Sequence, residues 1–489
     1  MHVRQVRQKA FRARSRTGCR TCRIRHLKCD ETPGACHNCT STGRICIPHF
    51  LGTGFRWKMT SDERRCFSRF QHYTIPGLLW LFKSPLWHTM VLQMCSSEPA
   101  VYHAVVALSA AHQDIETFGL PLPGDTRKSV WQEFALEHSI RSFSLLNKRY
   151  TSQDPLFRKV MLLCCFLFVL MELLHGRYDR VCQHLNSDNQ CTFLSPHGPV
   201  FTYDHHLKHP SWLGTHPHGF SSIYEARQTF EPLLSAIYRY LGRCWSLSQP
   251  DKMYHYESLC LKQGELLSRL SQYSGKFQLF RSQPKFSLRS EKDNHGAQII
   301  LLLYQTLAIT IKIALLPKHA PAIDHYTPEY KAYLHSVEGI MSNVSDHPSI
   351  SMEPSIVPTL FAIAFGCNDF NVRLRAVENL RCWPHFEGLF DSHWISLVLL
   401  EKMNIDFQEV IETGLCNQPN LNPSGLGLST EDDCMRVARE ITRIRERITK
   451  GQPNYLDGVL ESATYVASWP SVALIQKAKA RRIHMAKAS

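Results

Sequence analysis

The sequence predicts a small cysteine-rich module at the N-terminus, followed by one large all-α domain. Three observations predict this division. Six of the 18 cysteines lie within residues 19–46, in two copies of one pattern, while the others are scattered along the chain. From about residue 61 onward, apolar residues recur at helical spacing. Strand-like alternation bounded by hairpin turns is hard to find in the same region.

The six clustered cysteines form an internal repeat. Each half has the pattern C-x2-C-x6-C, and the second half follows the first at an offset of 17 residues. The cysteines are Cys19, Cys22, Cys29, Cys36, Cys39 and Cys46. Thiolates bind zinc tetrahedrally, and a C-x2-C turn places two sulfurs on one ion. One zinc held by the two C-x2-C pairs would leave Cys29 and Cys46 unused. Two zinc ions need eight coordination places, which six cysteines fill if two sulfurs bridge.

Positive charge gathers at the two ends of the chain. Of a formal net charge of +14, residues 1–46 contribute eleven Lys/Arg against only Asp30 and Glu31. The last thirteen residues contain five arginine or lysine residues and no aspartate or glutamate. The long segment between these two basic ends has a formal net charge of zero. A basic module on a neutral body predicts a polyanionic partner bound at the N-terminal end.

Residues 19–46 resemble the zinc binuclear cluster of fungal transcription factors, whose permitted spacings include C-x2-C-x6-C-x6-C-x2-C-x6-C. Lys28, Cys29 and Asp30 in sequence, and Pro33 in the connecting loop, also fit that family's pattern. The resemblance implies two Zn²⁺ ions bridged by Cys19 and Cys36. It also implies that each half is a short helix followed by an extended strand, in a DNA-binding protein of the nucleus.

The two halves differ in charge, and this difference predicts which half contacts DNA. The first half, CRTCRIRHLKC, carries Arg20, Arg23, Arg25, His26 and Lys28. The second half, CHNCTSTGRIC, carries only one arginine or lysine. Arginine and lysine side chains donate to guanine O6 and N7 in the major groove. The remaining basic side chains orient the protein by contacting phosphates. We therefore expect the first half to face double-stranded DNA.

His26 departs from the family pattern. The family usually has a lysine at this position, and the resemblance implies that it reads bases in CGG-like triplets. Histidine can still donate to guanine, but it is shorter and titrates near neutral pH. Upstream, Arg12, Arg14 and Arg16 form a basic arm that suits phosphate contacts or nuclear import.

The body, residues 61–475, is expected to be helical throughout. Glu98 and Pro99 open one helix, with apolar residues at helical spacing after them. Further helices are expected at residues 130–146, 160–175, 232–241, 297–316, 372–380 and 395–414. Residues 98–112, 162–176 and 367–383 are similar to the regulatory domain of the same fungal family. The expected division is a basic arm (1–16), the cluster (17–48), a linker (49–60), the helical domain (61–475) and a basic tail (476–489).

The linker bears on oligomeric state. Residues 47–60 contain Pro48, Gly52 and Gly54 and no heptad, so no coiled coil follows the cluster. A helix can begin only near Ser61 or Asp62. The chain therefore binds as a monomer or as a homodimer through its helical domain. The resemblance implies the transcription machinery or co-regulators as further partners.

Enzymatic and membrane functions are not expected. His205 and His209 could pair on a helix, but Pro210 and nearby glycines break it and no H-E-x-x-H occurs. Neither a phosphate-binding P-loop nor a G-x-S-x-G elbow is found. The longest apolar run, residues 160–171, is too short to span a bilayer. An acidic stretch at residues 401–412 suits either an activation segment or a core helix.

These expectations combine into one function. The chain is expected to regulate RNA polymerase II genes as a sequence-specific DNA-binding protein, reading CGG-like triplets in the major groove through the first half of the cluster. The alternative is a zinc–thiolate module that binds polyanions or proteins without reading a DNA sequence.

Overall fold

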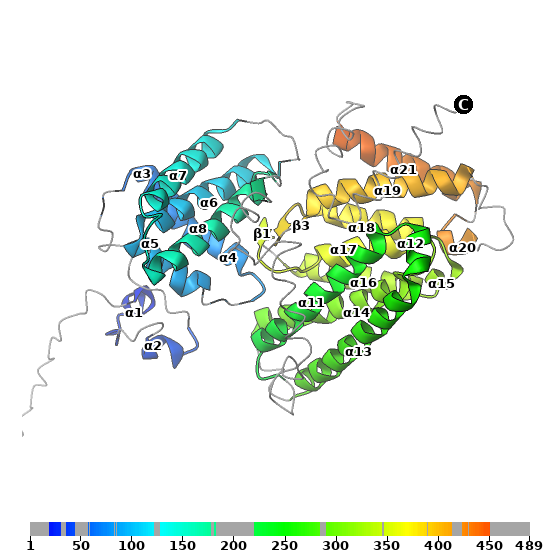
Figure 1. The fold of residues 1–489 in the computed structure, drawn as a ribbon, viewed down its shortest axis with the longest axis horizontal. Helices are drawn as coiled ribbons and strands as arrows, with labels where there is room; N and C mark the ends of the chain where they lie inside the picture. The colour runs from blue at the N-terminus through cyan, green and yellow to red at the C-terminus, as the bar shows by residue number, and fades with distance from the viewer. Residues whose placement is uncertain are drawn as a thin grey trace, which may run out of the picture.

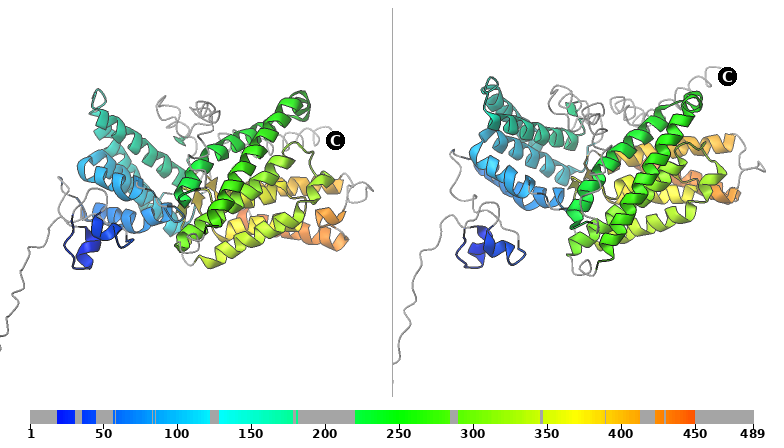
Figure 2. Two further views of the ribbon diagram at one scale, coloured as in Figure 1. Left: turned by 90° about the horizontal axis from the view of Figure 1, so that it is seen from below. Right: turned by 60° about the horizontal axis from the view of Figure 1, so that its bottom comes forward.

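The structure is a computed structural model that describes residues 19–30, 36–44, 57, 59–82, 84, 86–121, 128–177, 180–181, 220–283, 290–344, 347–388, 390–412, 423–428 and 430–449. Within these residues the regular secondary structure is helical apart from three strands of two residues each, and turns and irregular segments connect the elements. The predicted all-α class of the body is thus confirmed. Figures 1 and 2 show a small cysteine module near one group of helices (α3–α8), with a second group (α11–α21) beside it.

The cysteine module contains two short helices in corresponding positions of the repeat. They are α1 (Arg20–Ile24) and α2 (His37–Thr40). Each follows the first cysteine of its half and contains the second. The five described cysteines of the module are buried against one another and form an apolar cluster of their own.

The first helical unit runs from α3 to α8. Its members are α3 (Ser61–Arg69), η1 (Phe70–Thr74), α4 (Ile75–Leu78), η2 (Leu86–Val91), α5 (Leu92–Ser97), α6 (Pro99–Phe118), α7 (Val130–Asn147) and α8 (Pro155–Leu174). Helix α6 lies at its centre, buried along most of its length and in contact with both α7 and α8. Thr60 caps α3 in a reciprocal box with Glu63, so the helix begins where its capping residues allow.

The second helical unit surrounds α14. Its members are α11 (Ile223–Ser246), α12 (Gln249–Tyr254), α13 (Tyr256–Arg281), α14 (Glu291–Ile313), α15 (Pro321–Asp324), α16 (Thr327–Asn343), α17 (Val357–Gly366), α18 (Phe370–Cys382), α19 (Ser392–Glu412), α20 (Pro423–Leu426) and α21 (Glu431–Thr449). Helix α14 is long and apolar enough to cross a membrane, but 67% of its most apolar window is buried. Because it contacts α11, α13, α16 and α17, we interpret it as a core helix.

A small sheet joins the two units. Strand β1 (Ile350–Ser351) pairs in parallel with β2 (Phe386–Glu387), which pairs antiparallel with β3 (Phe390–Asp391). Ile350 and Phe386 are buried in the apolar cluster of the first unit, although their neighbours in the chain belong to the second. Met352 N also donates to Leu78 O at 3.1 Å. Chain segments about 270 residues apart therefore hold the two units together.

Most expected helices are present, with different ends. The stretch 232–241 lies inside α11, which begins nine residues earlier behind the N-cap Ser222 and carries Pro232 in its interior. The start expected at Pro232 is therefore wrong, because capping by Ser222 and burial of Ala226 and Phe230 outweigh the hydrogen bond that an interior proline removes.

The acidic stretch 401–412 belongs to α19 and is packed in the core. Glu401 and Asp406 are buried and paired, with Arg445 and Lys402 respectively, each at 2.7 Å. Of the two interpretations of this stretch, the core helix holds. Several other expectations lie outside the described residues: the basic arm, most of the linker, the histidines His205 and His209, and the basic tail.

Candidate metal centre and nucleic-acid interface

The sulfurs of the cysteine module converge on one point. One sulfur each from Cys19, Cys22, Cys29 and Cys36 lie within 4.8 Å of one another. The Cys19 and Cys22 sulfurs are 3.7 and 3.5 Å from the Cys36 sulfur. In a zinc tetrahedron with bonds of about 2.3 Å, neighbouring sulfurs lie about 3.8 Å apart. The spacing of these residues therefore fits a zinc ion bound by four thiolates.

A fifth sulfur extends the group. The sulfur of Cys39 lies 3.6 Å from that of Cys19 and 3.9 Å from that of Cys22. Burial and the neighbouring sulfurs raise the pKa of the Cys22 and Cys39 thiols, so sulfurs this crowded ionise together only against a cation. Cys46, the sixth cysteine of the repeat, lies outside the described residues.

The sequence repeat is also a repeat of backbone conformation. Two residues after α1, His26 lies in the left-handed region (φ 55°), and Leu27 N donates to Cys22 O at 2.8 Å. Seventeen residues later, Gly43 takes φ 62° and Arg44 N donates to Cys39 O at 2.9 Å. Both halves thus end their helix in a Schellman motif. Histidine adopts this conformation more readily than most residues do, whereas glycine does so without strain.

Hydrogen bonds connect the two halves around the sulfurs. The Arg25 guanidinium donates to Asn38 O at 3.1 Å and to Thr42 Oγ1 at 3.2 Å. In return, Asn38 Nδ2 donates to Lys28 O at 2.9 Å. The Asp30 carboxylate accepts from His37 N at 2.9 Å, at the start of α2. These contacts fix how the halves are oriented, and the sequence analysis assigned none of them.

The expected DNA contacts fall into three groups. His26 and Lys28 are exposed and follow α1 closely, so both side chains are accessible to a ligand. Arg20 and Arg23 lie on α1, but their side chains lie outside the described part of the chain. Arg25, by contrast, is half-buried and bonded to the second half. A count of charges does not reveal this role, because it treats every arginine as a surface cation.

Exposed apolar side chains adjoin the basic ones. Ile24 is 66% exposed and Leu27 is 44% exposed, at the end of α1 and just after it. Apolar side chains in such a position suit contact with thymine methyl groups or sugars in a groove. Sequence reasoning centred on charge did not single out these two residues.

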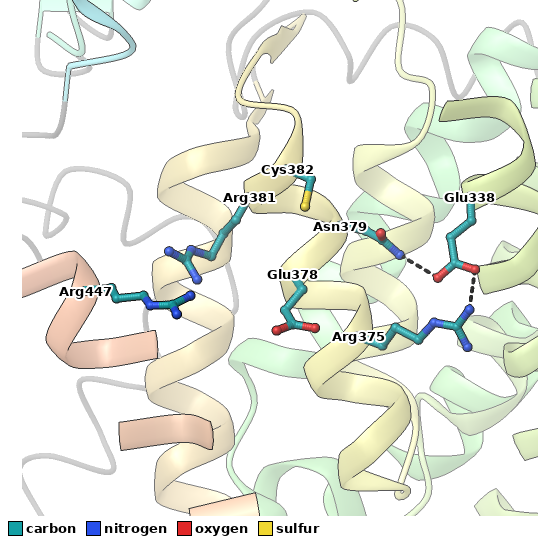
Figure 3. A pocket seen from close by; sticks show the side chains of 7 residues that line it. All are labelled: Glu338, Arg375, Glu378, Asn379, Arg381, Cys382 and Arg447. Carbon is teal, nitrogen blue, oxygen red and sulfur yellow. Dashed lines mark hydrogen bonds and ion pairs between the residues drawn. The ribbon is translucent and has the colours of Figure 1, made fainter. Parts of the chain in front are cut away.

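The helical units contain a surface hollow of about 520 Å³ between α16, α18 and α21. The hollow is lined by Glu338, Arg375, Glu378, Asn379, Arg381, Cys382 and Arg447. In Figure 3 Arg381 and Arg447 point toward one another, while Glu338 accepts from Arg375 and Asn379. Among the seven lining side chains there is no histidine, serine or threonine, so the hollow offers no nucleophile–base pair of the hydroxyl or imidazole type.

Two family models match the chain. Residues 17–49 match the fungal Zn(2)-Cys(6) binuclear cluster domain, and residues 65–189 match the fungal specific transcription factor domain. The first match covers the sulfur cluster and its connecting hydrogen bonds. The second covers most of the first helical unit.

Several relatives of the chain are named as transcription regulators. The chain is 25% identical over 212 residues to the aspercryptin biosynthesis cluster-specific transcription regulator atnN of Emericella nidulans, covering 36% of this chain and 34% of the relative. It is 24% identical over 195 residues to the transcription regulator lscL of Purpureocillium lilacinum, covering 33% and 45%. Over 38 residues it is 55% identical to the transcriptional regulatory protein moc3 of Schizosaccharomyces pombe, 8% of each chain.

The first two alignments span about a third and just under half of those relatives' lengths. No solved structure matches the chain. A zinc–thiolate module with a basic half, fused to helices shared with transcription regulators, indicates DNA-binding transcription regulation.

Proposed function

We propose, on the premise that this chain is a fungal transcription factor of the zinc binuclear cluster family, that it reads CGG-like triplets in the major groove through the first half of its cluster. The observation that carries the proposal is the asymmetry of the repeat. His26 and Lys28 are exposed just after α1, while the only arginine or lysine of the second half is Arg44. Such proteins act on RNA polymerase II genes in the nucleus, and we assign this chain the same role.

The metal content belongs to the same proposal. By resemblance to the family's cluster, Cys19 and Cys36 would bridge two Zn²⁺ ions, and their sulfurs lie 3.7 Å apart. The first ion would take Cys22 and Cys29 as its further ligands, and the second would take Cys39 and Cys46. Zinc supplies the folding energy of such small modules, because their ligands must be deprotonated and brought together. The thiolates would hold the ions, and this chain's own basic residues would contact DNA.

The division of the chain is proposed with the same boundaries as before: arm 1–16, cluster 17–48, linker 49–60, helical domain 61–475 and tail 476–489. The helical domain would contain two units rather than one. It would also provide any homodimer contact and the surfaces for co-regulators, because residues 47–60 contain no heptad.

DNA recognition is tested with the full-length chain and two duplexes that differ only in their CGG triplets, each at two salt concentrations. We expect the CGG duplex to bind at least tenfold more tightly, since each mismatched pair costs about 1–3 kcal/mol. Lys28→Ala should weaken binding, and Arg44→Ala, its control in the second half, should change it little. Equal affinity for both duplexes would favour the alternative, a polyanion-binding or protein-binding module without sequence recognition.

The zinc count is tested by the difference in metal content between the chain and its Cys19→Ser/Cys36→Ser variant. We expect a loss of two zinc ions per chain, because both proposed bridges are removed. A loss of one ion would instead indicate a mononuclear site. Taking the difference makes the result independent of zinc bound anywhere else on the chain.

A further inference from the structure

Two histidines and a glutamate come together inside the first helical unit. Glu63 lies on α3, His103 on α6 and His138 on α7, and one ligand atom from each lies within 4.8 Å of the others. The two imidazoles share a hydrogen bond, with His103 Nδ1 2.9 Å from His138 Nδ1, and the other nitrogen of the His138 ring, Nε2, lies 3.8 Å from Glu63 Oε1. The side chains of His138 and Glu63 are 1% and 6% exposed.

The donor set suits a transition metal. Imidazole nitrogens and a carboxylate oxygen bind Zn²⁺ at about 2.0–2.2 Å, and two histidines with one glutamate make up a known type of zinc site with an open fourth position. Ligand atoms of such an ion lie about 3.4 Å apart, and each histidine supplies one nitrogen. Binding therefore requires the imidazoles to give up their mutual hydrogen bond and rotate until one nitrogen of each faces the ion.

The neighbours of Glu63 leave it available as a ligand. Its Oε2 accepts from Thr60 N at 2.7 Å in the capping box, which holds the carboxylate in place. Arg141 Nη1 lies 3.3 Å from Oε1, but this arginine is 46% exposed and also pairs with Glu137 on its own helix at 2.5 Å. An incoming cation could therefore displace Arg141 from Glu63 without leaving the guanidinium unpaired.

We propose that Glu63, His103 and His138 form a second zinc site, separate from the cysteine cluster, with water in the fourth position. Helix α3 is the first helix after the linker, and α6 and α7 form the central hairpin of the first unit. Zinc bound here would tie the start of the helical domain to its core. The site does not depend on the proposed DNA recognition.

The test is metal content after the full-length chain is equilibrated with Zn²⁺ and freed of unbound metal. His103→Ala and Glu63→Gln should each hold one zinc ion fewer than the unaltered chain. Glu63→Gln keeps an oxygen for the capping box and removes only the charge. His335→Ala, at an exposed position on α16, is the matched control and should leave the count unchanged.

The difference of one ion separates this site from the cysteine cluster, whose contribution is the same in every variant. Circular dichroism checks that each variant keeps its helices. In addition, zinc should raise the thermal unfolding temperature of the first unit in the unaltered chain and not in Glu63→Gln. Equal zinc content in the unaltered chain and in both site variants would overturn the proposal, whatever number the cysteines bind.

Discussion

The residue at position 26 has two tasks that involve different parts of it. Its backbone closes α1 in a left-handed conformation, and its exposed imidazole follows the helix that is proposed to face DNA. The matching residue of the second half is Gly43, which has only the backbone task. Substitutions at position 26 can therefore separate folding of the module from recognition of DNA.

We predict that His26→Gly keeps the zinc content and weakens DNA binding by about 1–3 kcal/mol, because glycine suits the backbone but removes the base contact. His26→Lys should retain zinc and strengthen or retune binding. His26→Val should lower the stability of the module, since a β-branched residue at positive φ is strained. Metal content and duplex titration on the full chain measure both properties, and unchanged DNA binding in His26→Gly and His26→Lys would remove His26 from the interface.

Arg25 is predicted to hold the cluster together. Arg25→Lys keeps the charge but cannot reach Asn38 O and Thr42 Oγ1 with one planar group, so we expect zinc to leave faster to a chelator. The lost charged hydrogen bonds are worth about 1.5–3 kcal/mol. If Arg25 served only as a phosphate contact, lysine would replace it with no change in the rate of zinc release.

At the scale of elements, a carboxylate on strand β2 caps the N-terminus of helix α17. Glu387 of β2 is fully buried and accepts from the backbone N–H groups of Ser355, Ile356 and Val357 at 2.7, 3.0 and 3.1 Å. It also pairs with His385 Nε2 at 2.8 Å. These donors lie at the N-terminus of α17, where backbone N–H groups have no partner inside the helix and a negative charge is favoured.

We predict that Glu387→Ala lowers the free energy of unfolding by about 3–5 kcal/mol, because it leaves buried donors and His385 without their partner. Glu338→Ala is the control, since its ion-pair partner Arg375 is 60% exposed and pairs at the surface are worth about 0–1 kcal/mol. Denaturant unfolding measures both. Similar losses in the two variants would show that Glu387 does not organise the start of α17.

Helices could be predicted where burial gives them a local pattern. Helices α7 and α19 begin and end within three residues of the expected stretches, because apolar residues recur along them. Helix α13 was missed, although its buried residues follow a heptad-like stripe: Leu259, Leu266, Leu270, Tyr273, Phe277 and Phe280. The intervening polar residues concealed that stripe.

The strands could not be predicted at all. Each is two residues long, and Ile350 pairs with Phe386 only because the two helical units meet there. The cysteine spacing was enough to place the sulfurs together. The bonds of Arg25 and the left-handed His26 were not predictable, because they depend on how the halves pack rather than on residue type.

At the scale of the whole molecule, buried histidines make the two units sensitive to acid. Burial lowers the pKa of His175, at the end of α8, to about 3, and that of His319, before α15, to about 4. The ordinary value is about 6.5. Between pH 6.5 and about 4 the unfolded chain therefore binds protons that the folded chain does not, so the unfolded state gains stability as the pH falls.

We predict that the free energy of unfolding is insensitive to these groups above pH 6.5 and falls below it, by up to about 1.4 kcal/mol per pH unit for each histidine. Denaturant unfolding at pH 7.5, 6.5, 5.5 and 4.5, followed by far-ultraviolet circular dichroism, reports the helical units rather than the small cysteine module.

His175→Gln should reduce the slope of the free energy of unfolding against pH in the first unit, and His319→Asn should do so in the second. Asparagine is chosen there because His319 has a φ of 56°, which asparagine tolerates. His335→Gln, at an exposed position, should leave the slope unchanged, and a slope that stays the same in all three variants would mean that other groups cause the acid sensitivity.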